Sequence, residues 1–172
     1  MQKARNRILL GGILLLLDVR IGFINLLPNW LGYLLLAYDA KKMDEDQGSR
    51  MAVAGVCAAC LSFIGFFIDT EHRLFTWLFM GAIMVLEMLL FHGLTVGIWK
   101  RTQADGLLLQ RKILLVLYAV GIVAVGMGLN INFMVYVGAV IVFFARIYFL
   151  GVIRSKLPKE EGEEPQEETN LE

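Results

Sequence analysis

The chain has 172 residues, of which 58% are apolar, and its 16 basic and 16 acidic residues give a formal net charge of zero. The apolar residues form long continuous runs that a soluble domain with amphipathic surface helices does not need. The segments between the runs are too short for a soluble active site, and they contain no phosphate loop, dinucleotide fingerprint or basic-aromatic surface for nucleic acid. The sequence therefore predicts an integral membrane protein without a nucleic-acid partner, and it argues against an enzyme.

The first apolar run, Ile8 to Tyr38, is interrupted by polar residues and a proline. The interrupting residues are Asp18, Arg20, Asn25, Pro28 and Asn29. As one helix the run would be about 46 Å long, too long for one crossing of a hydrocarbon core of about 30 Å and too short for two. Pro28 cannot continue a helix but can begin one, and Asn25 can bond exposed backbone. The run therefore predicts a broken or re-entrant helical hairpin.

The same residues carry a family resemblance. Asp18 followed by Leu26-Leu27-Pro28-Asn29-Trp30-Leu31-Gly32-Tyr33 resembles the amino-terminal signature of small uncharacterised bacterial multi-pass membrane proteins. In that signature an Asp precedes a Leu-Pro-Asp-Phe-Ile-Gly-Tyr-like stretch. Asn29 stands where the signature leads us to expect an Asp, so one carboxylate is missing. The resemblance implies a polytopic fold in a bacterial inner membrane, and it implies no reaction.

Four further runs come near the length of about 20 residues that a helix needs to cross a bilayer. They are Met51 to Ile68, Leu74 to Ile98, Ile113 to Leu129 and Phe133 to Ile153. The runs lack the alternation of a membrane β-strand, and helices satisfy their own backbone hydrogen bonds in lipid. The predicted fold is an all-α bundle of four long transmembrane helices plus the amino-terminal hairpin, with five to six membrane segments in one domain.

Small and aromatic residues recur along these runs. Gly93 and Gly97, Gly121 with Gly126 and Gly128, and Ala54 with Ala58 offer small faces for close helix approach. Trp30, Trp77 and Trp99 fall near the expected membrane interfaces, as in an aromatic belt. We interpret both sets as packing and anchoring residues.

The charges are distributed unevenly. Lys and Arg are enriched in cytoplasmic loops, and here they gather in the segments on one side of the predicted bundle. The basic residues on that side are Lys3, Arg5, Arg7, Lys41, Lys42, Arg50, Lys100, Arg101, Arg111, Lys112, Arg154, Lys156 and Lys159, against Arg73 alone on the other. Both termini are therefore predicted to be cytoplasmic, and the first run must enter the membrane and return.

The end of the chain differs from the rest. Seven of the sixteen acids lie in the last thirteen residues, so the remainder of the chain is basic. A polar, like-charged segment without aromatic residues cannot bury enough apolar surface to offset its ordering entropy. We expect a polytopic domain of residues 1–157 and an acidic, disordered cytoplasmic tail of residues 158–172.

Five ionisable residues fall inside the predicted membrane segments: Asp18, Arg20, Glu87, His92 and Arg146. Ionisable groups are costly in lipid, so each is a functional candidate unless it is paired. Glu87 and Arg146 each lie thirteen residues into helices that run inward, which puts both about 20 Å below the external face and predicts a pair. Asp18, about 15 Å in from the other side, can join them with Arg20. The group is either an ion-pair network that fixes helix register or a polar site for substrate or protons.

Two further patterns suggest redox or metal chemistry. Cys57 and Cys60 have the C-x-x-C spacing of thiol oxidoreductases, and we interpret them as small, buried packing residues in mid-helix. The residues Met80, Met84, Met88 and His92 recur every four positions and are of types that bind Cu(I). These four span about 18 Å, too far for one metal, and methionine commonly fills gaps in apolar packing. No cofactor is predicted.

Three functions follow from these patterns. The favoured one is a transporter or permease-like subunit with a polar site around the broken hairpin. That site would comprise Asp18, Arg20, Asn25, Pro28, Asn29, Glu87 and Arg146. The alternatives are an accessory or structural protein of a larger membrane complex and, third, a membrane thiol or Cu(I) redox protein. Expected partners are membrane lipids and either copies of the same chain or a larger complex.

Overall fold

The computed structural model describes residues 2–17, 20–21, 24–25, 29–43, 48–65, 73–128, 131 and 133–157. For residues 2–3, 20–21, 24–25 and 73–76 it describes the backbone alone. The predicted tail, residues 158–172, lies outside the described residues.

The described part of the chain is helical, as predicted. Its helices are α1 (Gln2–Leu16), α2 (Asn29–Met43), α3 (Gly48–Ile64), α4 (Arg73–Thr102), α5 (Leu107–Met127) and α6 (Phe133–Lys156). Two-residue strands β1 (Arg20–Ile21) and β2 (Ile24–Asn25) pair antiparallel between α1 and α2, with Arg20 opposite Asn25. This short ladder was not predicted from the sequence.

Three helices are long and apolar enough to cross a membrane. They are α4 from Trp77 onward, α5 and α6, with 26, 21 and 24 residues. The fourth predicted long helix corresponds to α3, an apolar helix of 17 residues, about 26 Å in length. The described residues therefore contain three candidate membrane spans, and the apolar run that begins with α3 continues into residues that are not described.

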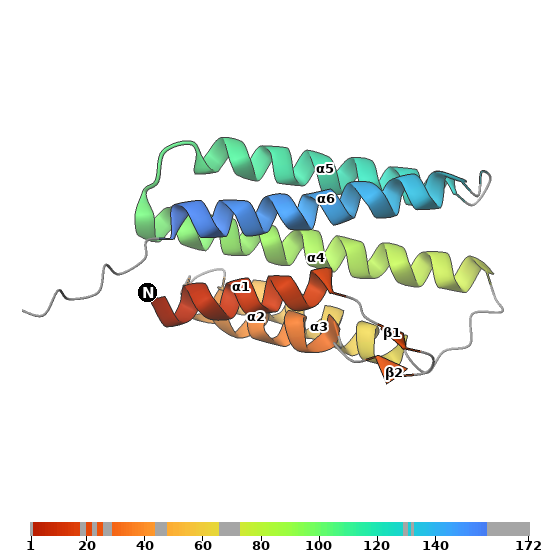
Figure 1. The fold of residues 1–172 in the computed structure, drawn as a ribbon, viewed down its shortest axis with the longest axis horizontal. Helices are drawn as coiled ribbons and strands as arrows, with labels where there is room; N and C mark the ends of the chain where they lie inside the picture. Colours follow the sequence, from red (N-terminus) through yellow and green to blue (C-terminus); the bar gives the residue numbers. More distant parts are fainter. Residues whose placement is uncertain are drawn as a thin grey trace, which may run out of the picture.

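The amino-terminal run folds into two helices that lie side by side in opposite directions (Figure 1). In the sequence α2 begins directly after Pro28, at Asn29, a residue type that favours helix starts. The two helices approach closely because each has a glycine at the contact. A Cβ placed on Gly32 would lie 2.7 Å from the carbonyl oxygen of Gly11.

Five of the helices form a closed ring. Contacts join α1 to α2, α2 to α4, α4 to α5, α5 to α6, and α6 back to α1. Figure 1 shows α4 in the middle of the view, with α5 and α6 on one side and α1 to α3 on the other. Helix α3 packs on α2 and α4 from outside the ring. The interior of the ring holds the aromatic core, in which Phe91 stacks on Phe149 with ring centroids 4.0 Å apart and meets Tyr118 edge-on.

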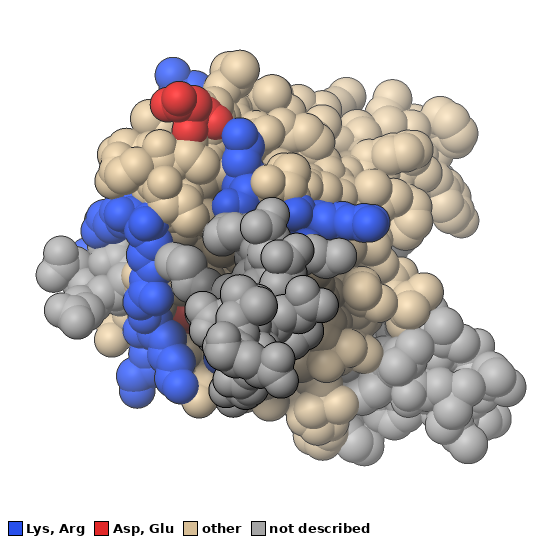
Figure 2. All heavy atoms as spheres, turned by 60° about the vertical axis from the view of Figure 1, so that its left-hand side comes forward, with Lys and Arg blue, Asp and Glu red and all other residues tan. Residues whose placement is uncertain are grey.

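Basic side chains gather at one end of this ring, where α1 begins and α2, α4 and α6 end. The last turns of these three helices carry Lys41, Lys42, Lys100, Arg101, Arg154 and Lys156. Figure 2 brings this end forward and shows Lys and Arg side chains spread across it. We call it the basic end.

The predicted small face at Gly121 lies at a helix contact. A Cβ on Gly138 of α6 would lie 2.8 Å from the carbonyl oxygen of Gly121 and 2.9 Å from the amide nitrogen of Val125, both on α5. Gly93 packs against Met51 of α3, whereas a Cβ on Gly126 would meet no atom within 4 Å. The α5–α6 contact is thus made by backbone against backbone, which leaves no room for a side chain.

We expect Gly138→Ala to lower the free energy of unfolding by about 1–3 kcal/mol, because backbone atoms cannot move aside as a flexible side chain can. Gly151→Ala is the matched control on the same helix. Its Cβ would meet no atom within 4 Å, and alanine is the better helix former, so stability should stay the same or rise slightly. Thermal unfolding in detergent checks both variants, and equal effects would contradict the close packing.

Candidate functional site

Glu87 of α4 and Arg146 of α6 form a buried ion pair. The Arg146 Nε donates to Glu87 Oε1 at 2.6 Å, and Nη2 donates to Oε2 at 2.7 Å. The side chain of Glu87 is 0% exposed and that of Arg146 is 20% exposed. This two-point geometry is the strong form of a carboxylate-guanidinium contact. The pairing predicted from the equal depth of the two residues is confirmed.

Three more groups complete the network. The hydroxyl of Tyr33 on α2 donates to Glu87 Oε2 at 2.7 Å, and that of Tyr118 on α5 donates to Oε1 at 2.6 Å. The Arg146 Nη1 donates to the carbonyl oxygen of Leu15 at 2.8 Å. Leu15 lies in the last turn of α1, where carbonyl groups lack a helical partner. Each of the five ring helices thus contributes one group.

The Glu87 carboxylate is saturated. An ionised carboxylate has about four lone-pair sites, and this one accepts four hydrogen bonds, two at each oxygen. A buried charge is tolerated only when it is paired and its remaining sites are bonded. The arrangement meets both conditions, so the carboxylate has no free site for a proton or a substrate.

Sequence reasoning missed Tyr33 and Tyr118. A signal was present for Tyr118, because it is the one side chain with a polar tip between Ile113 and Leu129. A buried tyrosine hydroxyl normally has a hydrogen-bond partner, so Tyr118 could have been assigned to the nearest membrane charge. Tyr33 ends the segment that carries the family resemblance, yet nothing in its spacing indicates Glu87. The Leu15 carbonyl has no sequence signal.

The residues at the break of the hairpin are only partly described. Asp18 and Pro28 lie outside the described residues, and Arg20 and Asn25 are described by their backbone in the β1–β2 ladder. That Asp18 and Arg20 join the Glu87 group stays a prediction. Asn29 is half-buried at the start of α2, and its buried side-chain oxygen Oδ1 has no hydrogen-bond partner within the part of the chain that the structure describes.

The interpretation of Cys57 and Cys60 as buried residues was wrong. Both are free thiols on the exposed face of α3. The reason is that α3 lies outside the ring and turns other small residues inward. Its buried residues include Ala54, Gly55, Ala58 and Ala59. The thiols therefore face the surroundings of the bundle.

The methionine stripe on α4 does not stay on one side of the bundle. Met80 is 41% exposed, whereas Met84 is 7% exposed and belongs to the core. Residues four apart on a helix drift around its axis, so the stripe passes from the surface into the interior. His92 is half-buried, and its Nδ1 has no hydrogen-bond partner among the residues that the structure describes. The four residues thus differ in burial and do not share one environment, which favours their interpretation as packing residues.

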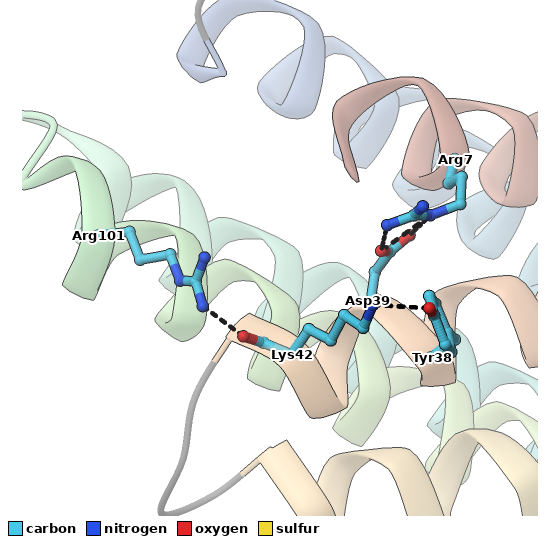
Figure 3. A network of polar contacts seen from close by, with 5 residues as sticks. All are labelled: Arg7, Tyr38, Asp39, Lys42 and Arg101. Atoms are coloured by element: carbon cyan, nitrogen blue, oxygen red, sulfur yellow. Dashed lines mark hydrogen bonds and ion pairs between the residues drawn. The ribbon is translucent and has the colours of Figure 1, made fainter. Parts of the chain in front are cut away.

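A second charged network lies at the basic end (Figure 3). Arg7 of α1 donates to both oxygens of Asp39 on α2, with Nη2 at 2.7 Å and Nε at 3.1 Å from Oδ1. The Asp39 side chain is 1% exposed. The hydrogen bond to Asp39 raises the pKa of Arg7 above its ordinary value. This pair was not predicted, because the sequence places both residues at the edges of the first run.

The same network closes the end of α2. Arg101 of α4 donates from Nε to the carbonyl oxygen of Met43 at 3.0 Å and from Nη2 to that of Lys42. A basic side chain there offsets the unpaired carbonyls and the negative end of the helix dipole. Lys42 in turn donates to the Tyr38 hydroxyl at 2.6 Å (Figure 3).

A pocket of about 130 Å³ opens beside this network. It is bounded by the start of α1 and by the ends of α2, α4 and α6. The lining residues are Ala4, Arg7, Asp39, Lys42, Met43, Ile98, Arg101 and Leu157. The bundle thus has two charged centres, one closed inside the ring and one open at its basic end.

We expect Arg146→Met to lower the free energy of unfolding by about 3–5 kcal/mol, because it leaves the Glu87 carboxylate buried without its partner. Glu87→Met should cost a similar amount. The double variant Glu87→Met, Arg146→Met should recover a large part of the loss, since no charge then remains in the interior. Unfolding in detergent is measured for the wild type, both single variants and the double variant. If the loss of unfolding free energy in the double variant equals the sum of the two single losses, the pair is not coupled.

Tyr118→Phe removes one hydrogen bond to Glu87 and should cost about 1–3 kcal/mol of unfolding free energy. Tyr136→Phe on α6 is the matched control, because Tyr136 is exposed on the bundle surface and should tolerate the change. The same unfolding measurement applies to both. Equal stability of the two variants would remove Tyr118 from the network.

Comparison with protein-family models, with curated proteins and with solved structures finds no match for this chain. The resemblance of the Asp18 to Tyr33 segment to small bacterial membrane proteins therefore stays a prediction. What the chain does is inferred from its two charged centres.

Proposed function

We propose that this chain is a small polytopic membrane protein of the accessory, structural kind, in which the interior charges hold the helices in register. The observation that supports this best is the saturation of the Glu87 carboxylate by four hydrogen bonds. A site for transport needs a group that can exchange its partner for a substrate or a proton. Glu87 would have to give up contacts to three other helices to do so.

The membrane arrangement belongs to this proposal. Helices α4, α5 and α6 cross the bilayer of the cell membrane, and we take the apolar helix α3 as a fourth crossing. Helices α1 and α2 have 15 residues each, about 22 Å, which is short of a hydrocarbon core of about 30 Å. We therefore take the hairpin to enter and return without crossing. By the positive-inside rule we take the basic end, where α1 begins and α6 ends, to be cytoplasmic.

The outer surface of the ring fits an accessory role. Large apolar side chains of α5 and α6 point away from the core, and they include Val116, Val123, Tyr136 and Phe144. In a bilayer these faces meet lipid chains or the helices of a larger membrane complex. Association in a membrane uses surface packing of this kind and requires no active site.

One observation favours transport as a second candidate. The Oδ1 of Asn29 is buried at the start of α2 and has no hydrogen-bond partner among the described residues. A buried polar atom without a partner costs free energy, and broken helices in transporters place such atoms at substrate sites. On this alternative the hairpin break, and not Glu87, would contact the substrate.

Proteoliposomes loaded with a pH-sensitive dye distinguish the two candidates. For the accessory protein we expect a proton flux equal to that of protein-free liposomes, together with a lowered unfolding temperature for Glu87→Gln. A wild-type flux that Asn29→Ala abolishes, at an unchanged unfolding temperature, would establish transport instead. Tyr136→Phe is the control, because it changes the outer surface and should affect neither measurement.

A further inference from the structure

The pocket at the basic end carries more positive than negative charge. Arg7, Lys42 and Arg101 line it, and Asp39 is the acid among its lining residues. Arg7 already holds both oxygens of Asp39, so this carboxylate has little left to offer the other two cations. The lining therefore has two positive charges in excess, which an anion from outside could neutralise.

The cations are held close together by an aromatic ring. The Cζ of Arg7 lies 5.1 Å from the centroid of the Tyr38 ring, and the Nζ of Lys42 lies 4.3 Å from it. Such cation-π contacts offset part of the repulsion between like charges, yet the two charges still repel each other. Arg5, also near the start of α1, is a buried residue at 8% exposure, and its Nε has no hydrogen-bond partner among the described residues. This end of α1 is thus arranged to favour a bound anion.

The shape and position of the pocket favour a phosphate. A volume of about 130 Å³ exceeds that of several waters, at about 30 Å³ each, and it admits a tetrahedral group. Ala4 places the first turn of α1 at the pocket, where free amide groups and the helix dipole favour negative charge. The lining also includes the apolar side chains of Met43, Ile98 and Leu157, which we call the apolar wall. A phosphate that carries an apolar stem matches both the charged and the apolar parts of the lining.

We propose that this pocket binds the phosphate of an anionic membrane lipid, with Lys42 and Arg101 as its charged contacts and the apolar wall against the glycerol and upper acyl chain. The pocket lies where apolar helices end in basic turns, the level at which lipid headgroups meet a membrane protein. Basic pockets between helices at that level bind anionic headgroups. The proposal is independent of whether the protein is accessory or a transporter, since it requires only that the bundle sits in a bilayer.

The test measures lipid binding to the purified full-length protein by native mass spectrometry, supported by thermal unfolding in detergent. Phosphatidylglycerol is titrated against phosphatidylcholine, which has the same phosphate but no net charge. Lys42→Gln should weaken binding of phosphatidylglycerol about fivefold, as expected for the loss of one cation near an anionic headgroup. Lys42→Arg should retain binding. Lys41→Gln is the matched control, because Lys41 is the exposed neighbour on α2 and does not line the pocket.

Three results would overturn the proposal. Equal weakening by Lys41→Gln and Lys42→Gln would show diffuse attraction of the basic end without a site. Equal affinity for the two lipids would show that the pocket does not select a headgroup with a net negative charge. A third arm of the experiment adds inorganic phosphate at millimolar concentration. If phosphate raises the unfolding temperature of the wild type but not of Lys42→Gln, and phosphatidylglycerol shows no such dependence on Lys42, then free phosphate is the ligand. Unchanged unfolding of the lipid-free Lys42→Gln protein confirms that the variant is folded.

Discussion

The ion pair between Glu87 and Arg146 is the contact on which the rest of the fold depends. A charge in an apolar interior is tolerated only with an opposite charge beside it and with every remaining hydrogen-bond site filled. Meeting that demand takes two tyrosine hydroxyls and one end-of-helix carbonyl, and these come from α2, α5 and α1. Because five helices must each present one group at the same point, the network permits few other arrangements. Its main contribution is therefore to the choice of one packing, and replacing a buried pair with apolar residues can cost little.

Glycines allow the helices to reach that point. Carbonyl groups of Gly11 and Gly121 stand where side chains on Gly32 and Gly138 would have to be, so α1 meets α2 and α5 meets α6 with backbone in contact. In lipid such close approach replaces the hydrophobic driving force that packs helices in water. The short distances in the network follow from it, because an arginine on α6 reaches α4 and α1 together only in a narrow ring. The small residues thus allow the close helix approach that the buried ion pair requires.

Depth along a helix could be read from the sequence, and rotation about its axis could not. Counting residues inward gave the Glu87 to Arg146 pair, because rise per residue is nearly constant. The same count says nothing about which side of a helix faces the core. This is why Cys57 and Cys60 were expected inside and are exposed, and why Tyr33 was not linked to Glu87. The contact of Arg7 with Asp39 was missed for a further reason, since it joins the two edges of a run whose return path depends on the hairpin.

The two charged centres differ in a way that bears on where function lies. Inside the ring, unpaired charge is too costly to persist, so selection for a stable bundle leaves Glu87 with no free site. At the basic end the pocket is open, so the cost of charge is lower there, and Lys42 and Arg101 can keep positive charge that Asp39 does not neutralise. A charged group can bind an external ligand only if its charge is not already neutralised by a partner within the protein. We therefore expect a ligand to bind at the basic end of the bundle and not at the interior charges, which the sequence alone favoured.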